Sequence, residues 1–414
     1  MMLRFYTILL RMGLILVPIF SRKSEKVKKW VKARNQWVRD LESFEKNKSL
    51  IWFHCASVGE FEQARPVIEA LAQTGDHQIA VTFFSSSGYE AKADYPLADV
   101  ITYLPSDLPE NVTPFLEMMR PDVAIFVKYE FWFNFMDALH ARSIPMALIS
   151  AYFPDKHWTI QWPGILLGER LKQFDVIFTQ DEMSRNILAS VMIDNAENIG
   201  DTRVDRVLAV KDETWSSDLL SAFFEGNQEL LLVGSNWSAD DRIIIPALKE
   251  HSDLKVIVVP HEIREDQKEV WISAFGDELI FIGDLESGQY NHQRILYVDR
   301  MGLLSKLYRY ATVAYVGGGF GKAVHNTLEA AVYNIPIVFG PKNQRFQEVQ
   351  SLKKLKIGIE VKSLPEFSKA LDHALNNEAY RNHVQLVSNE FFQDQKGATQ
   401  KIVTWIQRQF PEHK

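Results

Sequence analysis

Short apolar runs alternate with longer amphipathic stretches along most of the chain, and this alternation restricts the fold more than any other feature. The runs that we expect to form strands are residues 50–53, 78–83, 99–102, 122–127, 145–149, 175–178 and 197–199, then 229–233, 254–259, 279–282, 294–298, 312–316, 336–339 and 357–360. Helices are expected between or after them, for example at 61–74, 109–119, 131–142, 165–173, 181–191, 239–250, 302–310, 325–333, 345–354 and 366–376. Such alternation predicts an α/β fold in which helices cover both faces of a parallel sheet.

The pattern restarts after the polar stretch "VKDETWSSD" (210–218), and 414 residues are too many for one core of ordinary size. We therefore expect two doubly wound, Rossmann-like domains, at residues 47–209 and 210–395. The remaining segment, 396–414, is amphipathic over 396–410, where a helix is expected to cross back to the first domain. Two such domains place a cleft between the carboxyl ends of their sheets, where ligands bind in folds of this kind.

Residues 1–46 differ from the rest in charge and hydrophobicity. Residues 1–39 contain ten Lys or Arg and one acid, so residues 40–414 carry a charge of −16 within a total of −7. The apolar stretch "FYTILLRMGLILVPIF" (5–20) is shorter than the roughly 20 residues that span a bilayer, and Arg11 interrupts it. An apolar helix followed by basic residues favours attachment to the anionic cytoplasmic face of the inner membrane, although a helix packed on the body is an alternative. Positive charge confined to one end argues against nucleic-acid binding.

The stretch "VAYVGGGFGKAVHNTLEAAVYNIPIVFGP" (313–341) places an apolar strand before a glycine-rich turn. We expect a helix to open near His325 and to carry Glu329 in its first turns. Glycines let the backbone approach an anion, a helix N-terminus favours negative charge, and a carboxylate can accept hydrogen bonds from ribose hydroxyls. The pattern is neither a Walker A motif nor a dinucleotide fingerprint. It suggests a nucleotide-sugar site; alternatively the glycines only permit packing, Asn326 caps the helix and Glu329 faces solvent.

A second candidate lies in "IWFHCASVGEFEQARP" (51–66), where Ser57, Gly59 and Glu60 follow an apolar strand. Ser57 and Glu60 have the spacing of a capping box, which would be purely structural. Pro66 should kink the following helix and so weakens that interpretation. In the functional interpretation, the Glu60 carboxylate is a general base. The single cysteine, Cys55, excludes an intramolecular disulfide and fits a reducing compartment.

Six segments together give the chain a specific resemblance: "HCASVGE" (54–60), "KYEFWFN" (128–134), "IGDTRVD" (199–205), "VGS" (233–235), "VDRMGLLSKLY" (298–308) and "VGGGFGKAVHNTLEAA…GP" (316–341). In this order they resemble 3-deoxy-D-manno-octulosonic acid (Kdo) transferases, which move Kdo from CMP-Kdo onto lipid A precursors. The resemblance covers essentially the whole chain. It implies a GT-B fold, in which two Rossmann-like domains face each other across a cleft and the C-terminal one holds most of the donor.

The resemblance also implies roles for individual residues. Glu60 is the expected catalytic base, and Ser57, Gly59 and Glu130 lie on the acceptor side. The expected donor-binding residues are Ser235, His261, Arg264, Met301, Gly302, Gly318, Gly319, Lys322, His325, Asn326 and Glu329. The chain departs from the family pattern at Lys128 (an acid), Phe133 (Pro), Trp237 (His), Ala239–Asp240 (Gly-Glu), Pro260 (Arg) and Arg345 (Asn). Most of these departures fall at donor contacts, so they affect contact details more than the class of reaction.

The expected function is therefore inverting transfer of Kdo from CMP-Kdo to a lipid IV(A)-type acceptor in lipopolysaccharide biosynthesis. We expect no metal and no cofactor besides the donor substrate, because no Asp-x-Asp motif occurs and His54, His140 and His157 lack ligand spacing. One alternative is another GT-B enzyme, either a UDP-sugar transferase or a nucleotide-sugar epimerase. The other is a catalytically inactive protein that binds a lipid or a partner at the membrane.

Overall fold

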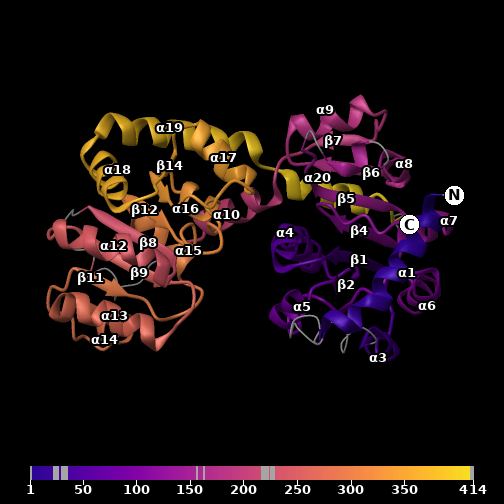
Figure 1. Ribbon diagram of the computed structural model, residues 1–414, viewed down its shortest axis with the longest axis horizontal. Helices are drawn as coiled ribbons and strands as arrows, with labels where there is room; N and C mark the ends of the chain where they lie inside the picture. The colour runs from indigo at the N-terminus through magenta and orange to yellow at the C-terminus, as the bar shows by residue number, and fades with distance from the viewer. Residues whose placement is uncertain are drawn as a thin grey trace. The chain divides into compact units, whose positions relative to one another are not determined.

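The computed structural model describes residues 2–21, 28, 36–154, 157–161, 164–215, 223 and 229–410. The chain divides into two compact units, one formed by Met1–Asp205 with Gln395–Lys414 and the other by Arg206–Asp394 (Figure 1). The division falls inside helix α10 (Thr202–Asp212), so the polar stretch that we expected to connect two domains begins within a helix. Residues 216–218 of that stretch lie outside the described residues.

The first unit is built on a parallel seven-stranded sheet with the strand order β3-β2-β1-β4-β5-β6-β7. Its strands are β1 (Leu50–Cys55), β2 (Gln78–Phe83), β3 (Val100–Tyr103), β4 (Val123–Val127), β5 (Met146–Ala151), β6 (Val176–Thr179) and β7 (Ala196–Asn198). Its helices are α1 (Met2–Ser21), α3 (Gln36–Glu42), α4 (Val58–Thr74), α5 (Ser86–Lys92), α6 (Pro109–Met119), α7 (Phe133–Ala141), α8 (Ile165–Gly168), α9 (Glu182–Ser190) and α20 (Ala398–Gln407).

Strand β1 explains why this sheet needs helices on both faces. Leu50 and Trp52 join a core that also holds residues of α6 and α7, whereas Ile51 and Phe53 join a second core with α4 and α20. Successive side chains of a strand point to opposite faces, so a run that is apolar at every position is stable only when both faces are covered.

The second unit repeats this design with the strand order β10-β11-β9-β8-β12-β13-β14, again all parallel. Its strands are β8 (Leu230–Asn236), β9 (Lys255–Pro260), β10 (Leu279–Phe281), β11 (Ile295–Tyr297), β12 (Val313–Val316), β13 (Ile337–Phe339) and β14 (Gly358–Glu360). Its helices are α12 (Ser238–Glu250), α13 (Glu265–Phe275), α14 (Ile282–Glu286), α15 (Leu304–Leu307), α16 (Leu328–Ala331), α17 (Gln347–Lys354), α18 (Leu364–Asn376) and α19 (Glu378–Gln395). The two parallel sheets confirm the predicted α/β class.

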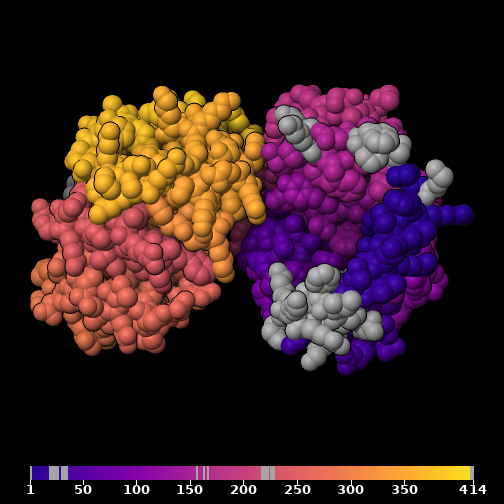
Figure 2. Space-filling model, in the orientation of Figure 1, coloured from indigo at the N-terminus to yellow at the C-terminus, as the bar shows by residue number. Residues whose placement is uncertain are grey.

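The N-terminal segment packs on the first unit. Helix α3 buries Trp37 and Leu41 in the core, and α1 runs along the outside of the same unit (Figures 1 and 2). Most of the basic run that we expected to meet a membrane, at residues 22–27 and 29–35, lies outside the described residues. Among the described helices, none combines the length and the apolar character needed to cross a bilayer.

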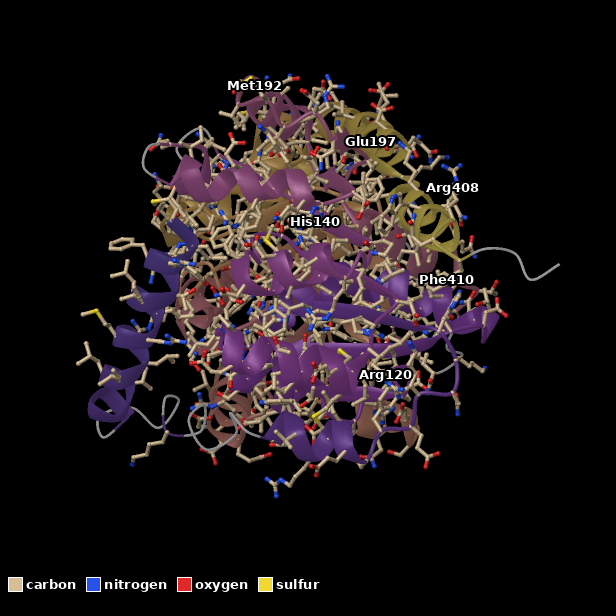
Figure 3. All side chains as sticks on the ribbon, turned by 90° about the vertical axis from the view of Figure 1, so that its right-hand side faces the viewer. Arg120, His140, Met192, Glu197, Arg408 and Phe410 are labelled. Carbon is tan, nitrogen blue, oxygen red and sulfur yellow. The ribbon has the colours of Figure 1, made fainter. Side chains whose placement is uncertain are left out.

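Helix α20 returns to the first unit after the second is complete. Ile402 and Ile406 pack into the core that also contains Ile68 and Leu71 of α4. Beyond the helix, the ring of Phe410 lies 4.3 Å from that of His77, and Figure 3 shows Arg408 and Phe410 at the end of α20. The C-terminal helix is therefore an integral part of the first unit.

Candidate functional site

The first candidate site lies where the direction of winding changes in the sheet of the first unit. Strand β1 pairs with β2 on one side and with β4 on the other. Helix α4, which follows β1, packs on one face of the sheet, and α7, which follows β4, packs on the opposite face. Such a switch point leaves a crevice at the carboxyl ends of the two strands. The segments that enter it are residues 56–60, which include the start of α4, and the loop 128–132.

Ser57 and Glu60 stand at the start of α4. Ser57 is the N-cap residue and is extended, but its hydroxyl does not cap the helix and instead donates a 2.8 Å hydrogen bond to Oε2 of Glu60. The Ser57 backbone N–H also bonds to the Glu60 carboxylate, so half of a capping box forms. We expected Pro66 to kink this helix, but α4 continues without a break to Thr74, with Pro66 buried inside it. Gly59 is exposed and leaves the approach to Glu60 uncrowded.

Glu130 is held at the end of a hydrogen-bonded chain that reaches into the core. Its Oε2 accepts a 2.7 Å hydrogen bond from the indole N–H of Trp132 and lies 3.3 Å from Nε2 of the fully buried His54. The other imidazole nitrogen lies 2.9 Å from the hydroxyl of Thr82, which accepts from the indole N–H of Trp52. Because a carboxylate can only accept, the contact with Glu130 places a proton on Nε2 of His54. This chain fixes the position of the Glu130 carboxylate.

The two carboxylates of this site influence each other. Burial is the largest cause that raises the pKa of Glu60, and the negative charge of Glu130 raises it further. The bonds from Ser57 and the positive charge of Lys128 act in the opposite direction, but the pKa remains above its ordinary value. Lys128 has the left-handed backbone conformation, with φ = 70°. Glu60 is thus a partly exposed carboxylate with increased basicity, which suits a general base.

The second candidate site lies at the corresponding switch point of the other sheet, where β8 has β9 on one side and β12 on the other. Gly317 and Gly318 follow β12 and are required by the backbone. A side chain at Gly317 would lie 2.3 Å from the carbonyl oxygen of Ser235, and Gly318 has φ = 91°. Packing at Gly317 and backbone conformation at Gly318 therefore each require glycine, whether or not the turn also binds a ligand.

Asp240 ties the two loops of this site together. Its Oδ2 accepts 2.8 Å hydrogen bonds from the backbone N–H groups of Trp237 and Gly318, and its Oδ1 accepts one of 2.9 Å from the Tyr315 hydroxyl. Asp240 is completely buried. The N–H group of Gly318, one of the expected donor-binding residues, is consequently occupied by this carboxylate.

Three rings lie in a stack at the mouth of this site. The rings of His261 and His325 are 4.1 Å apart, and the Trp237 ring lies 4.7 Å from that of His261. Lys322 is exposed and its ammonium group lies 5.3 Å from the centre of the Trp237 ring. The pKa of His325 is lowered to about 4, mainly by burial and secondly by the charge of His261. Burial also lowers the pKa of His261. We call Trp237, His261 and His325 the aromatic stack; it presents neutral imidazoles beside a cation.

The helix expected to open near His325 is shorter than predicted, since α16 comprises only Leu328–Ala331. The Asn326 side-chain oxygen accepts from the Leu328 N–H at 3.2 Å, and its amide donates to Oε1 of Glu329 at 3.0 Å. Asn326 thus forms a turn directly before the helix, whose N-cap residue is Thr327, so it does not itself cap the helix as the structural alternative proposed. Glu329, however, lines a small cavity of about 40 Å³ together with Ser305 and Tyr333.

The other donor-side residues are more dispersed. Ser235 has φ = 51° and its backbone lies against Gly317. Gly319 packs against the backbone of Gly340. Arg264 lies on the surface, where it pairs with Asp266. Met301 is 71% exposed, in a turn with Gly302 at φ = 87°. The described contacts therefore join His261, Lys322 and His325 but link neither Arg264 nor Met301 to them.

Sequence analysis did not identify His54, Asp240 and Trp237 as parts of these sites. The polarity of His54 was a signal in the sequence, because His54 and Thr82 are polar residues inside two apolar strands. They pair in the register of β1 and β2, and buried polar side chains need hydrogen-bond partners. In the sequence, Asp240 and Trp237 stand out only as departures from the family pattern. Their contacts depend on the geometry of the glycine turn.

Comparison with known proteins shows which family the chain resembles. A family model described as 3-deoxy-D-manno-octulosonic-acid transferase (kdotransferase) matches residues 29–206. The Kdo transferase of Aquifex aeolicus is 29% identical over 347 residues, covering 81% of this chain and 88% of the relative. That of Haemophilus influenzae is 27% identical over 370 residues, covering 85% of each chain. A bifunctional glycosyltransferase/methyltransferase of Fusobacterium nucleatum is 24% identical over 410 residues, which are 96% of this chain but 62% of that protein.

Solved structures agree on the fold. The UDP-GlcNAc 2-epimerase from Neisseria meningitidis has a TM-score of 0.56 at 15% identity, covering 87% of this chain and all of that one (100%). MurG of Acinetobacter baumannii has a TM-score of 0.56 at 13% identity, covering 87% and 99%. These likenesses show the GT-B fold alone. The family model over residues 29–206 and the Kdo transferase relatives show that most of the chain is similar to Kdo transferases, and they support its membership of that family.

Proposed function

We propose that this protein transfers Kdo from CMP-Kdo to a lipid IV(A)-type lipid A precursor, with inversion at the anomeric carbon. The observation that carries the proposal is the Glu60 carboxylate at the first switch point, with its pKa raised by burial and by Glu130. A base for an alcohol must be exposed enough to reach the hydroxyl and basic enough to hold its proton. Glu60 meets both requirements.

In the proposed reaction, Glu60 accepts the proton of the acceptor hydroxyl. The oxygen then forms a bond to the anomeric carbon of Kdo while the bond from that carbon to the phosphate oxygen breaks, and CMP leaves with the electron pair. Attack opposite the leaving group inverts the configuration. Ser57 orients the Glu60 carboxylate, and Glu130, held by His54 and Trp132, keeps the basicity of Glu60 high.

On the donor side, Lys322 and the two imidazoles of the aromatic stack are the groups that we assign to the CMP phosphate and the Kdo carboxylate. Charged and polar donors of this kind stabilise an anion that leaves water. Glu329 is assigned to the ribose hydroxyls, and the turn at Met301 and Gly302 to the cytosine edge. The reaction as proposed requires no metal ion and no further cofactor, so activity should persist in excess EDTA.

We also propose that the protein acts at the cytoplasmic face of the inner membrane, attached through α1. The outer face of α1 exposes Phe5, Ile8 and Met12, each more than half exposed. Exposed apolar side chains along one helical face favour the interface of a bilayer. Basic residues next to α1 in the sequence would meet anionic lipid.

The test is an assay of purified protein with CMP-Kdo and lipid IV(A), which should release CMP and yield a heavier lipid. Glu60→Gln should bind CMP normally but reduce CMP release by about a hundredfold or more. Glu69→Gln, two turns further along α4 and paired with Arg65, is the matched control and should retain activity. Acceptor-independent hydrolysis, or activity with UDP-sugars alone, would identify another GT-B enzyme instead. No turnover with any nucleotide sugar would favour a binding protein.

A further inference from the structure

Helix α1 is anchored to the first unit by side chains of its first half. The Tyr6 hydroxyl donates a 2.9 Å hydrogen bond to Asp107, and the Thr7 hydroxyl lies 3.2 Å from the Asn134 side-chain oxygen. One turn later, Arg11 pairs with Glu110 through two hydrogen bonds. These contacts fix the direction in which the helix runs, and in Figure 3 it is seen in profile along one edge of the unit.

A groove of about 540 Å³ lies between α1 and the body of the first unit. On the helix its wall is a stripe formed by Leu10, Gly13, Leu14 and Val17, which share a face because they recur three and four positions apart. We call this the α1 groove. Its lining is apolar apart from a few atoms near Asp107, and it carries no cationic side chain among its lining residues. This excludes a phosphate or sugar as its natural occupant.

The opposite wall connects the α1 groove to the candidate acceptor site. It includes Phe84, which follows β2 directly, and Trp132, whose ring lies 4.9 Å from that of Phe84. Trp132 therefore contacts both sites: its side chain lines the apolar groove, and its indole N–H donates a hydrogen bond to Glu130. A ligand that has its polar group beside Glu130 and an apolar chain attached to it would continue into the α1 groove.

We propose that the α1 groove binds one fatty acyl chain of the lipid acceptor and thereby positions the sugar hydroxyl at Glu60. The proposal rests on the proposed function and adds a specific acyl-chain subsite to it. It differs from attachment of α1 to the membrane, which would use the outer face with Phe5 and Met12. An acyl chain is linear and apolar, as the groove is, and each buried methylene can add up to about fourfold in affinity.

Gly13 offers a direct test. A Cβ atom placed there meets no atom within 4 Å, so a larger side chain fits without disturbing the fold. Gly13→Phe would fill the α1 groove and would also raise the helical propensity of α1. Ile15→Phe is the matched control, because it adds the same side chain to the same helix at a position that is 73% exposed.

The experiment uses the full chain, CMP-Kdo and a series of acceptors with one headgroup and increasing acyl length, below their critical micelle concentrations. For wild type and Ile15→Phe, kcat/KM should rise at least tenfold from the shortest to the longest chain. For Gly13→Phe, the ratio between the longest and shortest acceptors should fall to about two. An undiminished ratio in Gly13→Phe would overturn the proposal. Absence of transfer to every acceptor by the wild type would instead refute the proposed function.

A binding measurement separates the two outcomes further. A fatty acid brominated near the end of its chain quenches indole fluorescence at close range, so it should quench wild type more than either Trp132→Phe or Gly13→Phe. Ile15→Phe should be quenched like the wild type. Equal quenching of all four proteins would contradict an occupied α1 groove, whether or not the enzyme is active.

Discussion

The indole N–H of Trp237 donates a 2.8 Å hydrogen bond to Nε2 of His325. Nε2 can accept only when it carries no proton, so the bond selects the neutral imidazole with its proton on Nδ1. Burial favours the same neutral form and lowers the pKa of His325 to about 4. A tryptophan at a position where the family usually has histidine thus determines which nitrogen of His325 can donate to a ligand.

Replacement of Trp237 by Phe should raise the pKa of His325 by about half to one unit, because the neutral imidazole loses one hydrogen bond. The measurement is a pH titration of the histidine ring nitrogens by NMR, in which the Nδ1–H form should no longer dominate. Trp215→Phe is the control, since Trp215 contacts Arg309 elsewhere in the second unit. An unchanged titration of His325 in Trp237→Phe would show that burial alone selects the tautomer.

The pH dependence of activity should respond to the two charges beside Glu60. Only deprotonated Glu60 is an active base, so kcat/KM rises with pH through its pKa. Glu130→Gln removes a negative charge and should shift this acid limb to lower pH, whereas Lys128→Met removes a positive charge and should shift it to higher pH. The measurement is the pH profile of kcat/KM for each variant.

A matched control for this pair is Glu169→Gln, which removes an exposed charge of the first unit that is paired with Lys172. Its acid limb should coincide with that of the wild type. Shifts of the same sign in Glu130→Gln and Lys128→Met would mean that Glu60 is not the group that titrates.

Replacement of Asp240 should lower the free energy of unfolding by an amount that depends on whether the new side chain can still accept hydrogen bonds. Asp240→Ala leaves two backbone N–H groups and the Tyr315 hydroxyl without their acceptor and should cost about 3 kcal/mol of unfolding free energy. Asp240→Asn should cost about 1 kcal/mol, because its oxygen can accept both N–H groups while its amide donates to a reoriented hydroxyl. Urea unfolding checks this, with the exposed Asp253→Ala as control. Equal losses in both Asp240 variants would contradict it.

Asp107 should make the first unit less stable as pH rises. Burial raises its pKa to about 6 from an ordinary 3.8, so between these values the native state binds more protons than the unfolded state. The free energy of unfolding therefore falls as pH rises through this window, by at most about 3 kcal/mol. Asp107→Asn should lack that slope, measured by urea unfolding with hydrogen exchange of α7 peptides. An identical slope in the variant would exclude Asp107 as its source.

The fold was accessible from sequence wherever burial leaves a strong periodic pattern. Helix α6 has the predicted bounds, and the predicted strands occur within a few residues of their positions. Two of the longer helices of the second unit, α13 and α19, were missed because each buries a narrow stripe with a polar member. In α13 the buried residues are Gln267, Trp271 and Phe275. In α19 they are Val384, Ser388 and Phe392, too few to give a clear helical period.

The candidate sites were accessible only in part, because side-chain orientation depends on contacts between distant segments. The positions of Glu60 and Glu130 after two strands pointed to one edge of a sheet, but the chain from Thr82 through His54 to Glu130 depends on strand register. The role of Asp240 depends on the glycine turn 78 residues away. Periodicity says nothing about such pairs.

Helix α20 has a consequence for how this protein is made. Its residues Ala398, Ile402, Val403 and Ile406 complete a core whose other buried members lie before residue 200, and the whole second unit is encoded between them. During synthesis, the apolar side of α4 therefore stays exposed to solvent while nearly two hundred further residues emerge from the ribosome. The unit that begins folding first is also completed last, so a nascent chain released before residue 398 would expose an apolar surface open to aggregation.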